Sequence, residues 1–195
     1  MEQIINEIKN TYIISEKYTE YIYKIQINNV FYVLIILYKD STPWNDLKSF
    51  KLNEYQERVI SNYRLCSKLN IGPKLYRTYR ILDVPILITE YLPIKNSQKM
   101  IDSNKDSFKK FISNIHKLGI YHGDLHGGNF AMNSNYHLKI IDLETLFYAD
   151  EIDIESNISF NPLIKEWIDY GFEIDTIKEF IDAELNKNWM FYPED

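Results

Sequence analysis

The stretch that decides the fold is Tyr121–Glu144, which reads YHGDLHGGNFAMNSNYHLKIIDLE. His122, Asp124 and Asn129 come before one short apolar segment, and Asp142 comes after a second one. The glycines and the alternating apolar residues favour a loop, a short hairpin and then a second loop that carries an acid. A His-Gly-Asp triplet alone indicates only a turn. The joint pattern, with an amide at a fixed offset and a second acid at a strand end, is far more specific.

Two carboxylates and a carboxamide held in this way suit phosphoryl transfer from Mg-ATP. Asp124 would orient the acceptor hydroxyl and take its proton. Asn129 and Asp142 would hold the metal ion against the phosphates. The sequence therefore predicts ATP and Mg²⁺, or Mn²⁺, as the cofactors of this window.

Asn129 follows Asp124 by five residues, and Asp142 follows Asn129 by thirteen. In these spacings the window resembles the catalytic and metal-binding loops of the protein-kinase-like superfamily. The sequence motif HGDLHGGN followed by IDLE is most similar to the atypical branch of this superfamily. That branch includes aminoglycoside and choline kinases, lipopolysaccharide-core kinases, the small RIO group and compact bacterial effector kinases.

The resemblance also suggests roles for three neighbouring residues. His126 stands where Ser/Thr kinases carry a lysine that faces the γ-phosphate, so it would donate a hydrogen bond there, most readily when protonated. Glu144 stands where choline-kinase-like enzymes carry an acid that assists metal binding. His122 would stabilise the loop through backbone contacts. A zinc site is the alternative use of the histidines, but the four in the chain lack paired ligand spacing.

Length and composition indicate one globular domain. The chain has 195 residues, 45% of them apolar and 26% charged. A net charge of −6 without a long basic run argues against nucleic-acid binding. The lone Cys66 cannot form an intrachain disulfide and is expected in the core. The N-terminal residues do not form a secretory signal, and the longest apolar run, 30–38, is too short to span a bilayer. We expect a cytoplasmic protein, or one in the host cytosol if it is viral or an effector.

The first half of the chain reads as strands around one helix. Residues 11–27 predict two strands, with a two-residue turn at Asn28-Asn29, and residues 30–38 predict a buried third strand. Residues 52–69 predict a helix. Its apolar stripe consists of Tyr55, Val59, Tyr63 and Cys66. Two more strands, 74–80 and 81–91, follow around a turn at Asp83.

The second half begins with a polar connector, 93–106. A helical stripe follows, with Gly119 as its C-cap. The stripe consists of Phe108, Phe111, Ile112, Ile115 and Leu118. After Glu144 we expect an acidic loop and two helices, one from Pro162 to Gly171 and one capped by Asp175. The resemblance implies an α+β, two-lobed protein-kinase-like fold in a single domain. Residues 1–91 would form a small antiparallel-sheet N-lobe, and residues 92–195 would form a reduced, mainly helical C-lobe.

The resemblance further implies a phosphate-binding Lys–Glu pair and an adenine-binding hinge. Glu57, with Glu54 as the fallback, is the candidate for the helix acid, although a solvated helix acid explains it equally well. Isoleucines occupy the family's strand-3 lysine position, so the candidate cation is Lys24, narrowly ahead of Lys39. For both residues, a solvated strand lysine is the favoured interpretation. Residues 11–27 contain no glycine, so the glycine-rich loop is missing. The hinge segment ITEYL would present backbone groups of Glu90 and Leu92 to the adenine.

Three functions remain open from the sequence. The first is a minimal atypical protein kinase that transfers the γ-phosphate of ATP to a protein hydroxyl, with a protein substrate recognised through a docked partner. The second is a pseudokinase that acts as a protein-binding module, favoured by the missing lysine and glycines. A small-molecule kinase is the third. The chain lacks an Ala-Pro-Glu motif and a long activation segment, which favours a compact protein kinase over an ordinary one.

Overall fold

The structure is a computed structural model that describes residues 1–38, 52–95, 105–123 and 127–148. It divides into two compact units. The described residues up to Leu92 belong to the first unit, and those from Pro93 onward belong to the second. The chain is an α+β protein whose larger sheet has five antiparallel strands.

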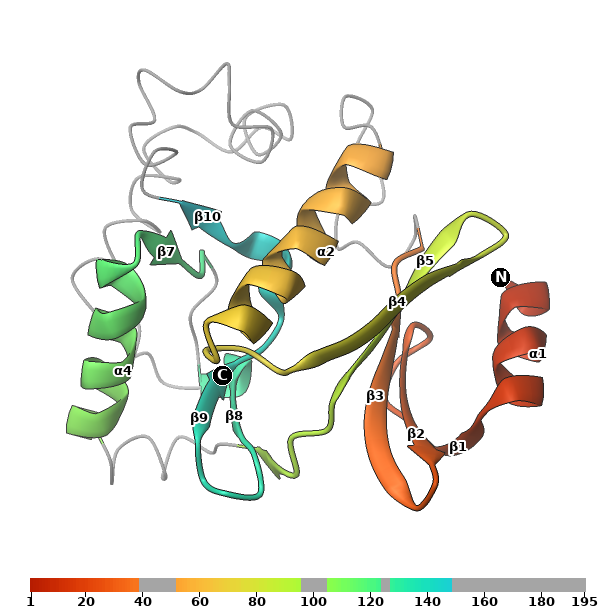
Figure 1. Cartoon of the computed structure of the whole chain (residues 1–195), viewed down its shortest axis with the longest axis horizontal. Helices are drawn as coiled ribbons and strands as arrows, with labels where there is room; N and C mark the ends of the chain where they lie inside the picture. The colour runs from red at the N-terminus through yellow and green to blue at the C-terminus, as the bar shows by residue number, and fades with distance from the viewer. Residues whose placement is uncertain (39–51, 96–104, 124–126, 149–195) are drawn as a thin grey trace. The chain divides into compact units, whose positions relative to one another are not determined.

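Segments rich in isoleucine and tyrosine build the sheet of the first unit, in the parts of the chain where the sequence predicted strands. Its strands lie in the order β1-β2-β3-β5-β4 (Figure 1). Their bounds are β1 Ile13–Lys17, β2 Ile22–Ile27, β3 Val30–Ile36, β4 Leu75–Ile81 and β5 Val84–Glu90. Asn28 and Asn29 have φ values of 48° and 62°, so the predicted two-residue turn between β2 and β3 is confirmed. Asp83, at 64°, turns the chain between β4 and β5 in the same way.

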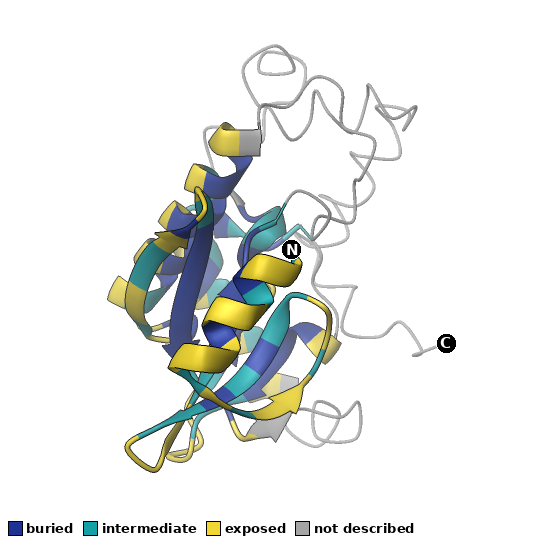
Figure 2. Cartoon of the chain, turned by 90° about the vertical axis from the view of Figure 1, so that its right-hand side faces the viewer, coloured by how far each residue is buried: buried dark blue, intermediate teal, exposed yellow. Residues whose placement is uncertain are grey.

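A helix that the sequence did not predict, α1 (Glu2–Thr11), covers one face of this sheet. Ile4 and Ile8 are buried there, on the side of α1 that meets the strands, whereas its outer residues are exposed (Figure 2). Their burial removes apolar surface of both the helix and the sheet from water, which stabilises both. The sheet residues packed in this cluster are Tyr23, Ile25, Leu34, Ile36, Ile81, Ile86 and Ile88.

Helix α2 (Leu52–Lys68) lies on the other side of the sheet from α1 (Figure 1). The predicted stripe is confirmed, because Tyr55, Val59, Tyr63 and Cys66 are all buried. Burial raises the pKa of the Cys66 thiol to about 12, so this cysteine is a neutral core residue, as predicted.

The second unit is built from helix α4 (Lys105–Lys117) and short strands. The three-stranded sheet has the order β6-β8-β9, and β7 pairs with β10 in a separate two-stranded sheet. The bounds are β6 Ile94–Lys95, β7 Ile120–Tyr121, β8 Phe130–Met132, β9 Leu138–Ile140 and β10 Phe147–Tyr148. Phe108 of α4 meets Phe130 of β8 edge to face, with ring centroids 5.2 Å apart. Gly119 has φ 71°, which fits its predicted place after the helix.

Two details of the predicted core are wrong. Strand β3 is not buried throughout, because Val30 and Phe31 are 52% and 40% exposed beside the turn. Leu118 is 52% exposed, because α4 ends at Lys117 and the chain then turns away from the helical stripe. Lys39 and the two helices predicted after Glu144 lie outside the described residues.

No helix in the described ranges combines the length and the apolarity that crossing a bilayer would need.

Candidate functional site

The loop that begins at His122 is fastened to the segment that follows β9. The His122 imidazole is 2% exposed, and its Nε2–H donates a hydrogen bond to the carbonyl oxygen of Ile141 at 2.7 Å. The Thr145 hydroxyl donates a hydrogen bond to the carbonyl oxygen of His122, also at 2.7 Å. These two bonds tie the start of the predicted catalytic loop to both sides of Asp142. The backbone role expected for His122 is confirmed.

The β8–β9 hairpin brings two of the predicted metal ligands to the same end. Phe130 pairs with Ile140 in the antiparallel register. One step further, the Ile141 N–H donates a hydrogen bond to the carbonyl oxygen of Asn129 at 2.9 Å. Asn129 closes the short 3-10 helix η2 (Gly127–Asn129), and Asp142 directly follows Ile141. Residues thirteen apart in sequence are therefore neighbours at one end of the hairpin.

Asp142 adopts an uncommon backbone conformation for a residue with a side chain. Its φ and ψ are 58° and 61°, the left-handed helical region, and it precedes the 3-10 helix η3 (Leu143–Thr145). Steric strain makes this region costly for L-residues, although aspartate tolerates it better than most. Asp142 is exposed, whereas Leu143 beside it is buried. The buried neighbour thus anchors a strained turn that presents a carboxylate to solvent, a combination typical of functional sites.

The predicted ligand set is only partly within the described ranges. Glu144, in η3, is half-buried and lies two residues after Asp142. Asp124 and His126 fall outside the described residues. Among the residues that the structure describes, no group of three His, Cys, Asp or Glu side chains gathers as a metal site. The oxygens of Asn129, Asp142 and Glu144 suit Mg²⁺, a hard cation that protein sites often share with substrate phosphates.

The predicted hinge lies at the end of β5 in the first unit. The backbone N–H of Glu90 donates to the carbonyl oxygen of Lys74, and the Lys74 N–H donates to Glu90 Oε2 at 3.1 Å. The Glu90 side chain is therefore used to hold the start of β4. Leu92 is only 9% exposed, and among the described residues no hydrogen bond is formed by its backbone. A strand-end residue whose backbone groups form no hydrogen bond within the described ranges is a candidate to bind the edge of a flat ligand.

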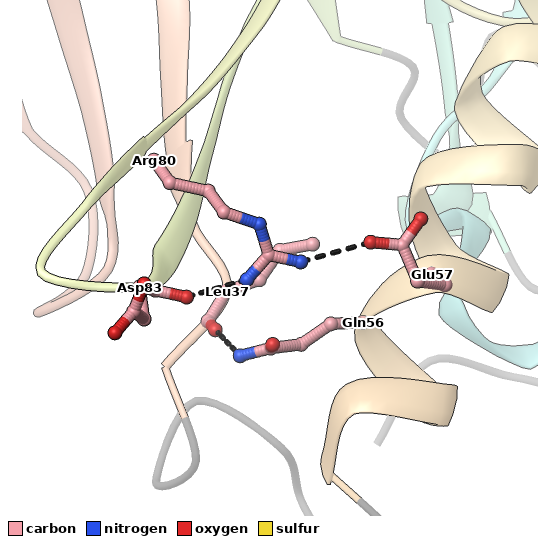
Figure 3. Close-up of polar contacts among 5 residues, drawn as sticks. All are labelled: Leu37, Gln56, Glu57, Arg80 and Asp83. Atoms are coloured by element: carbon pink, nitrogen blue, oxygen red, sulfur yellow. Dashed lines mark hydrogen bonds and ion pairs between the residues drawn. The ribbon is translucent and has the colours of Figure 1, made fainter.

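The structure does not bring Lys24 and Glu57 together. Glu57 Oε1 instead receives a hydrogen bond from Arg80 of β4 at 2.8 Å (Figure 3). Arg80 also donates to the carbonyl oxygen of Asp83 in the β4–β5 turn. Both side chains of the ion pair are largely solvent-exposed, at 40% and 57%, so the pair contributes little stability.

Lys24 has a different set of partners. Its ammonium lies 3.9 Å from Glu16 Oε2 and 3.2 Å from the Tyr91 hydroxyl. It also lies 4.5 Å from the ring centroid of Phe31 and 4.4 Å from that of Tyr91. The sequence did not indicate these contacts, because Tyr91 is 67 residues away along the chain.

A second residue that the sequence did not single out is Gln56. It is 2% exposed, and its side-chain amide donates a hydrogen bond to the carbonyl oxygen of Leu37, just after β3 (Figure 3). Helix α2 and strand β3 are the two elements that a kinase would join by its Lys–Glu pair, according to the resemblance. Here a neutral, buried hydrogen bond joins them.

No model of a protein family matches this chain, and no curated protein matches its sequence. The chemistry of the site must therefore be inferred from the residues themselves.

Proposed function

We propose that the chain is a Mg-ATP-dependent phosphotransferase, a minimal atypical protein kinase whose acceptor is a protein hydroxyl. The observation that carries the proposal is the hydrogen bond between Ile141 and Asn129, which holds Asn129 beside Asp142 at one end of the β8–β9 hairpin. The backbone of Asp142 is strained and its side chain is exposed. This is the arrangement that an Asn–Asp pair would need to share one cation.

Each residue of the window has a role in this proposal. Asp124 accepts the proton of the attacking hydroxyl, and His126 donates a hydrogen bond to the γ-phosphate. Asn129 and Asp142, assisted by Glu144, hold Mg²⁺ or Mn²⁺. The cation, when bound, neutralises the charge that develops on the phosphates. The buried His122 keeps the loop in place through its bond to Ile141.

The nucleotide base would bind at the strand end in the first unit. The backbone groups of Leu92 have no partner among the described residues, and its side chain is buried. They would meet the edge of adenine together with the carbonyl oxygen of Glu90. Lys24 and Glu57 were the residues that the sequence suggested as a pair binding the phosphates of this nucleotide. In this structure Glu57 is engaged by Arg80.

A pseudokinase that serves as a protein-binding module is the second candidate. The β1–β2 segment contains no glycine to cradle a phosphate. Strand β3 carries Ile35 and Ile36 where the family has its lysine. The carboxylate of Glu57 is occupied by a guanidinium instead. These three features favour weak phosphate binding by the first unit.

The test is transfer of the labelled γ-phosphate of ATP to proteins of a cell lysate, with Mg²⁺ or Mn²⁺. The wild type is compared with Asp142→Asn, because asparagine tolerates the same left-handed backbone. We expect Asp142→Asn to lower transfer by about a hundredfold or more, the scale of losing one transition-state contact. Asp106→Asn, the same charge change at an exposed position in the first turn of α4, is the matched control and should remain active.

Wild-type transfer no greater than that of Asp142→Asn, together with no shift of the melting temperature by ATP, would refute the enzyme. A thermal shift with ATP but no transfer would instead identify the pseudokinase.

A further inference from the structure

Three residues of the first unit surround the ammonium group of Lys24. The Lys24 side chain is 17% exposed, and its ammonium contacts two aromatic rings, a hydroxyl and a carboxylate. The partners are Phe31, Tyr91 and Glu16, and with Lys24 they are called the Lys24 clamp. The rings meet edge to face, with centroids 6.0 Å apart. Aromatic faces and a carboxylate attract a cation together, so this ammonium is held at a defined place.

The clamp fastens elements that are distant in the sequence. Glu16 lies on β1, directly opposite Lys24 on β2. Phe31 lies on β3, and Tyr91 follows β5. Tyr18, between β1 and β2, adjoins the same groups: burial, and then the neighbouring Tyr91 and Glu16, raise the pKa of its hydroxyl. The β1–β2 hairpin is thereby joined to the strand end that leads into Leu92.

The strand register shows that the Lys24 side chain points along the sheet toward Phe31 and away from Ile35. Lys24 is opposite Val33, whereas Ile22 is opposite Ile35, which with Ile36 marks where the family resemblance expects a phosphate-binding lysine. Phe31 is opposite Gln26, on the other side of Lys24 from that position. Lys24 itself lies two residues, or roughly 7 Å, from the Ile22–Ile35 row, and its ammonium contacts Phe31, which lies on the side away from that row.

The Lys24 clamp lies on the face of the five-stranded sheet that α1 does not cover. Val33 and Thr89 pair across β3 and β5 in the same row as Lys24. The α1 cluster uses the alternate residues of these strands, such as Leu34 and Ile88. Lys24 consequently lies on the face opposite α1, one row further from the hinge than Phe31.

We propose that Lys24 is a positioning residue for the nucleotide base and not a phosphate ligand. The clamp holds the ring of Tyr91, and Tyr91 is bonded to Leu92, whose backbone would meet the base. It also joins the glycine-free β1–β2 hairpin to Tyr91, through the contacts of Lys24 with Glu16 and with the Tyr91 hydroxyl. This inference rests on the proposed nucleotide site. It gives Lys24, which the sequence suggested as a phosphate ligand, a role at the base instead.

The test compares ATP with adenosine, which has the same base and no phosphate, as ligands of the full-length chain in calorimetry. Lys24→Met removes the charge and keeps the stem, whereas Tyr91→Leu removes the ring. We expect both variants to weaken ATP and adenosine by the same factor, roughly three- to tenfold. Lys17→Met, an exposed lysine of the same hairpin, is the matched control and should change neither affinity.

A loss of ATP affinity in Lys24→Met with unchanged adenosine affinity would overturn the inference, because only a phosphate ligand gives that pattern. Unchanged affinity for both ligands would overturn it as well. Amide hydrogen exchange of the β1–β2 turn gives a readout that needs no nucleotide. The Tyr18 N–H donates to the Ile22 carbonyl oxygen at 2.9 Å, and its exchange should accelerate in Lys24→Met and Tyr91→Leu but not in Lys17→Met.

The two proposals fail in different ways. If the wild type binds neither ATP nor adenosine, the nucleotide site is wrong, and with it the role of Lys24 as a positioning residue for the base. Faster exchange in the two clamp variants then still supports the clamp as the fastening of the hairpin. Exchange that stays at the wild-type rate in both variants refutes the clamp itself.

Discussion

Replacing Asp142 by glycine and by alanine should reverse the usual stability ranking of these two residues. Both variants lose the carboxylate and every contact that it makes, so the difference between them reports the backbone alone. At φ 58° and ψ 61° the Cβ of alanine costs about 1–2 kcal/mol, and glycine avoids this cost. Glycine loses about 0.4–1 kcal/mol more backbone entropy on folding, which offsets part of the gain. We therefore expect Asp142→Gly to be the more stable variant by roughly 0.5–1 kcal/mol, the difference of these two terms.

Asn114 supplies the matched comparison. It is exposed near the C-terminal end of helix α4, where glycine is about 1 kcal/mol less stable than alanine. Urea unfolding of the four variants, followed by circular dichroism, gives both differences in free energy. The sign should be opposite at the two positions. For a chain of this size, 1 kcal/mol corresponds to about 2–4 °C in melting temperature, so thermal melts resolve it as well.

A glycine variant that is the less stable one at both positions would refute a left-handed backbone at Asp142. The same proteins also separate strain from chemistry. If Asp142 is a metal ligand, the glycine and alanine variants should both lack phosphate transfer, although they differ in stability. Transfer that follows stability, and not the presence of the carboxylate, would contradict the ligand role.

The remaining predictions concern the packing of the first unit. Ile8→Ala should lower the free energy of unfolding by about 2–4 kcal/mol, because the side chain is 1% exposed; a loss below about 1 kcal/mol in urea unfolding would show that α1 does not pack on the sheet. Gln56→Leu strands the buried carbonyl of Leu37 and should cost about 1–3 kcal/mol, whereas Glu57→Gln removes an exposed ion pair and should cost under about 1 kcal/mol by the same measurement. Cys66 should resist alkylation at pH 8 until the protein unfolds. Since burial raises its pKa from 9.0 to about 12, its stabilising contribution is complete below pH 9, and the stability advantage of wild type over Cys66→Ala should shrink as the pH rises above 9.

Much of the first unit could be predicted because its signals are local. Runs of β-branched and aromatic residues define the strands, and Asn28-Asn29 supplies the left-handed turn between two of them. Helix α1 was missed because most of its residues are polar. Ile4 and Ile8, four residues apart, were the available signal, but their burial depends on a sheet formed later in the chain. So few apolar residues on one short helix cannot specify which surface will cover them.

The place of Glu57 could have been predicted from the helix period alone. Residues two apart on a helix are separated by about 200°, so a residue between Tyr55 and Val59 of the buried stripe points away from it. Glu57 is accordingly exposed and meets Arg80 at the edge of the sheet. Gln56 precedes Val59 by three residues and falls on the buried side, as the structure shows. The stripe alone could thus have identified Gln56 as the polar residue that faces inward, whereas the family resemblance directed attention to Glu57.

The partners of Lys24 could not be predicted in this way. Spacing rules describe neighbours on one element, and the contact with Tyr91 spans two distant segments of the chain. The position of this ammonium also affects the chemistry of the proposed enzyme. If Lys24 holds the base end, strand β3 supplies only Ile35 and Ile36 where a cation would meet the phosphates. The charge of the triphosphate would then be neutralised chiefly by a divalent cation held by Asn129 and Asp142. Loss of the lysine therefore does not by itself exclude catalysis; it makes phosphoryl transfer depend more heavily on the residue pair that the β8–β9 hairpin holds together.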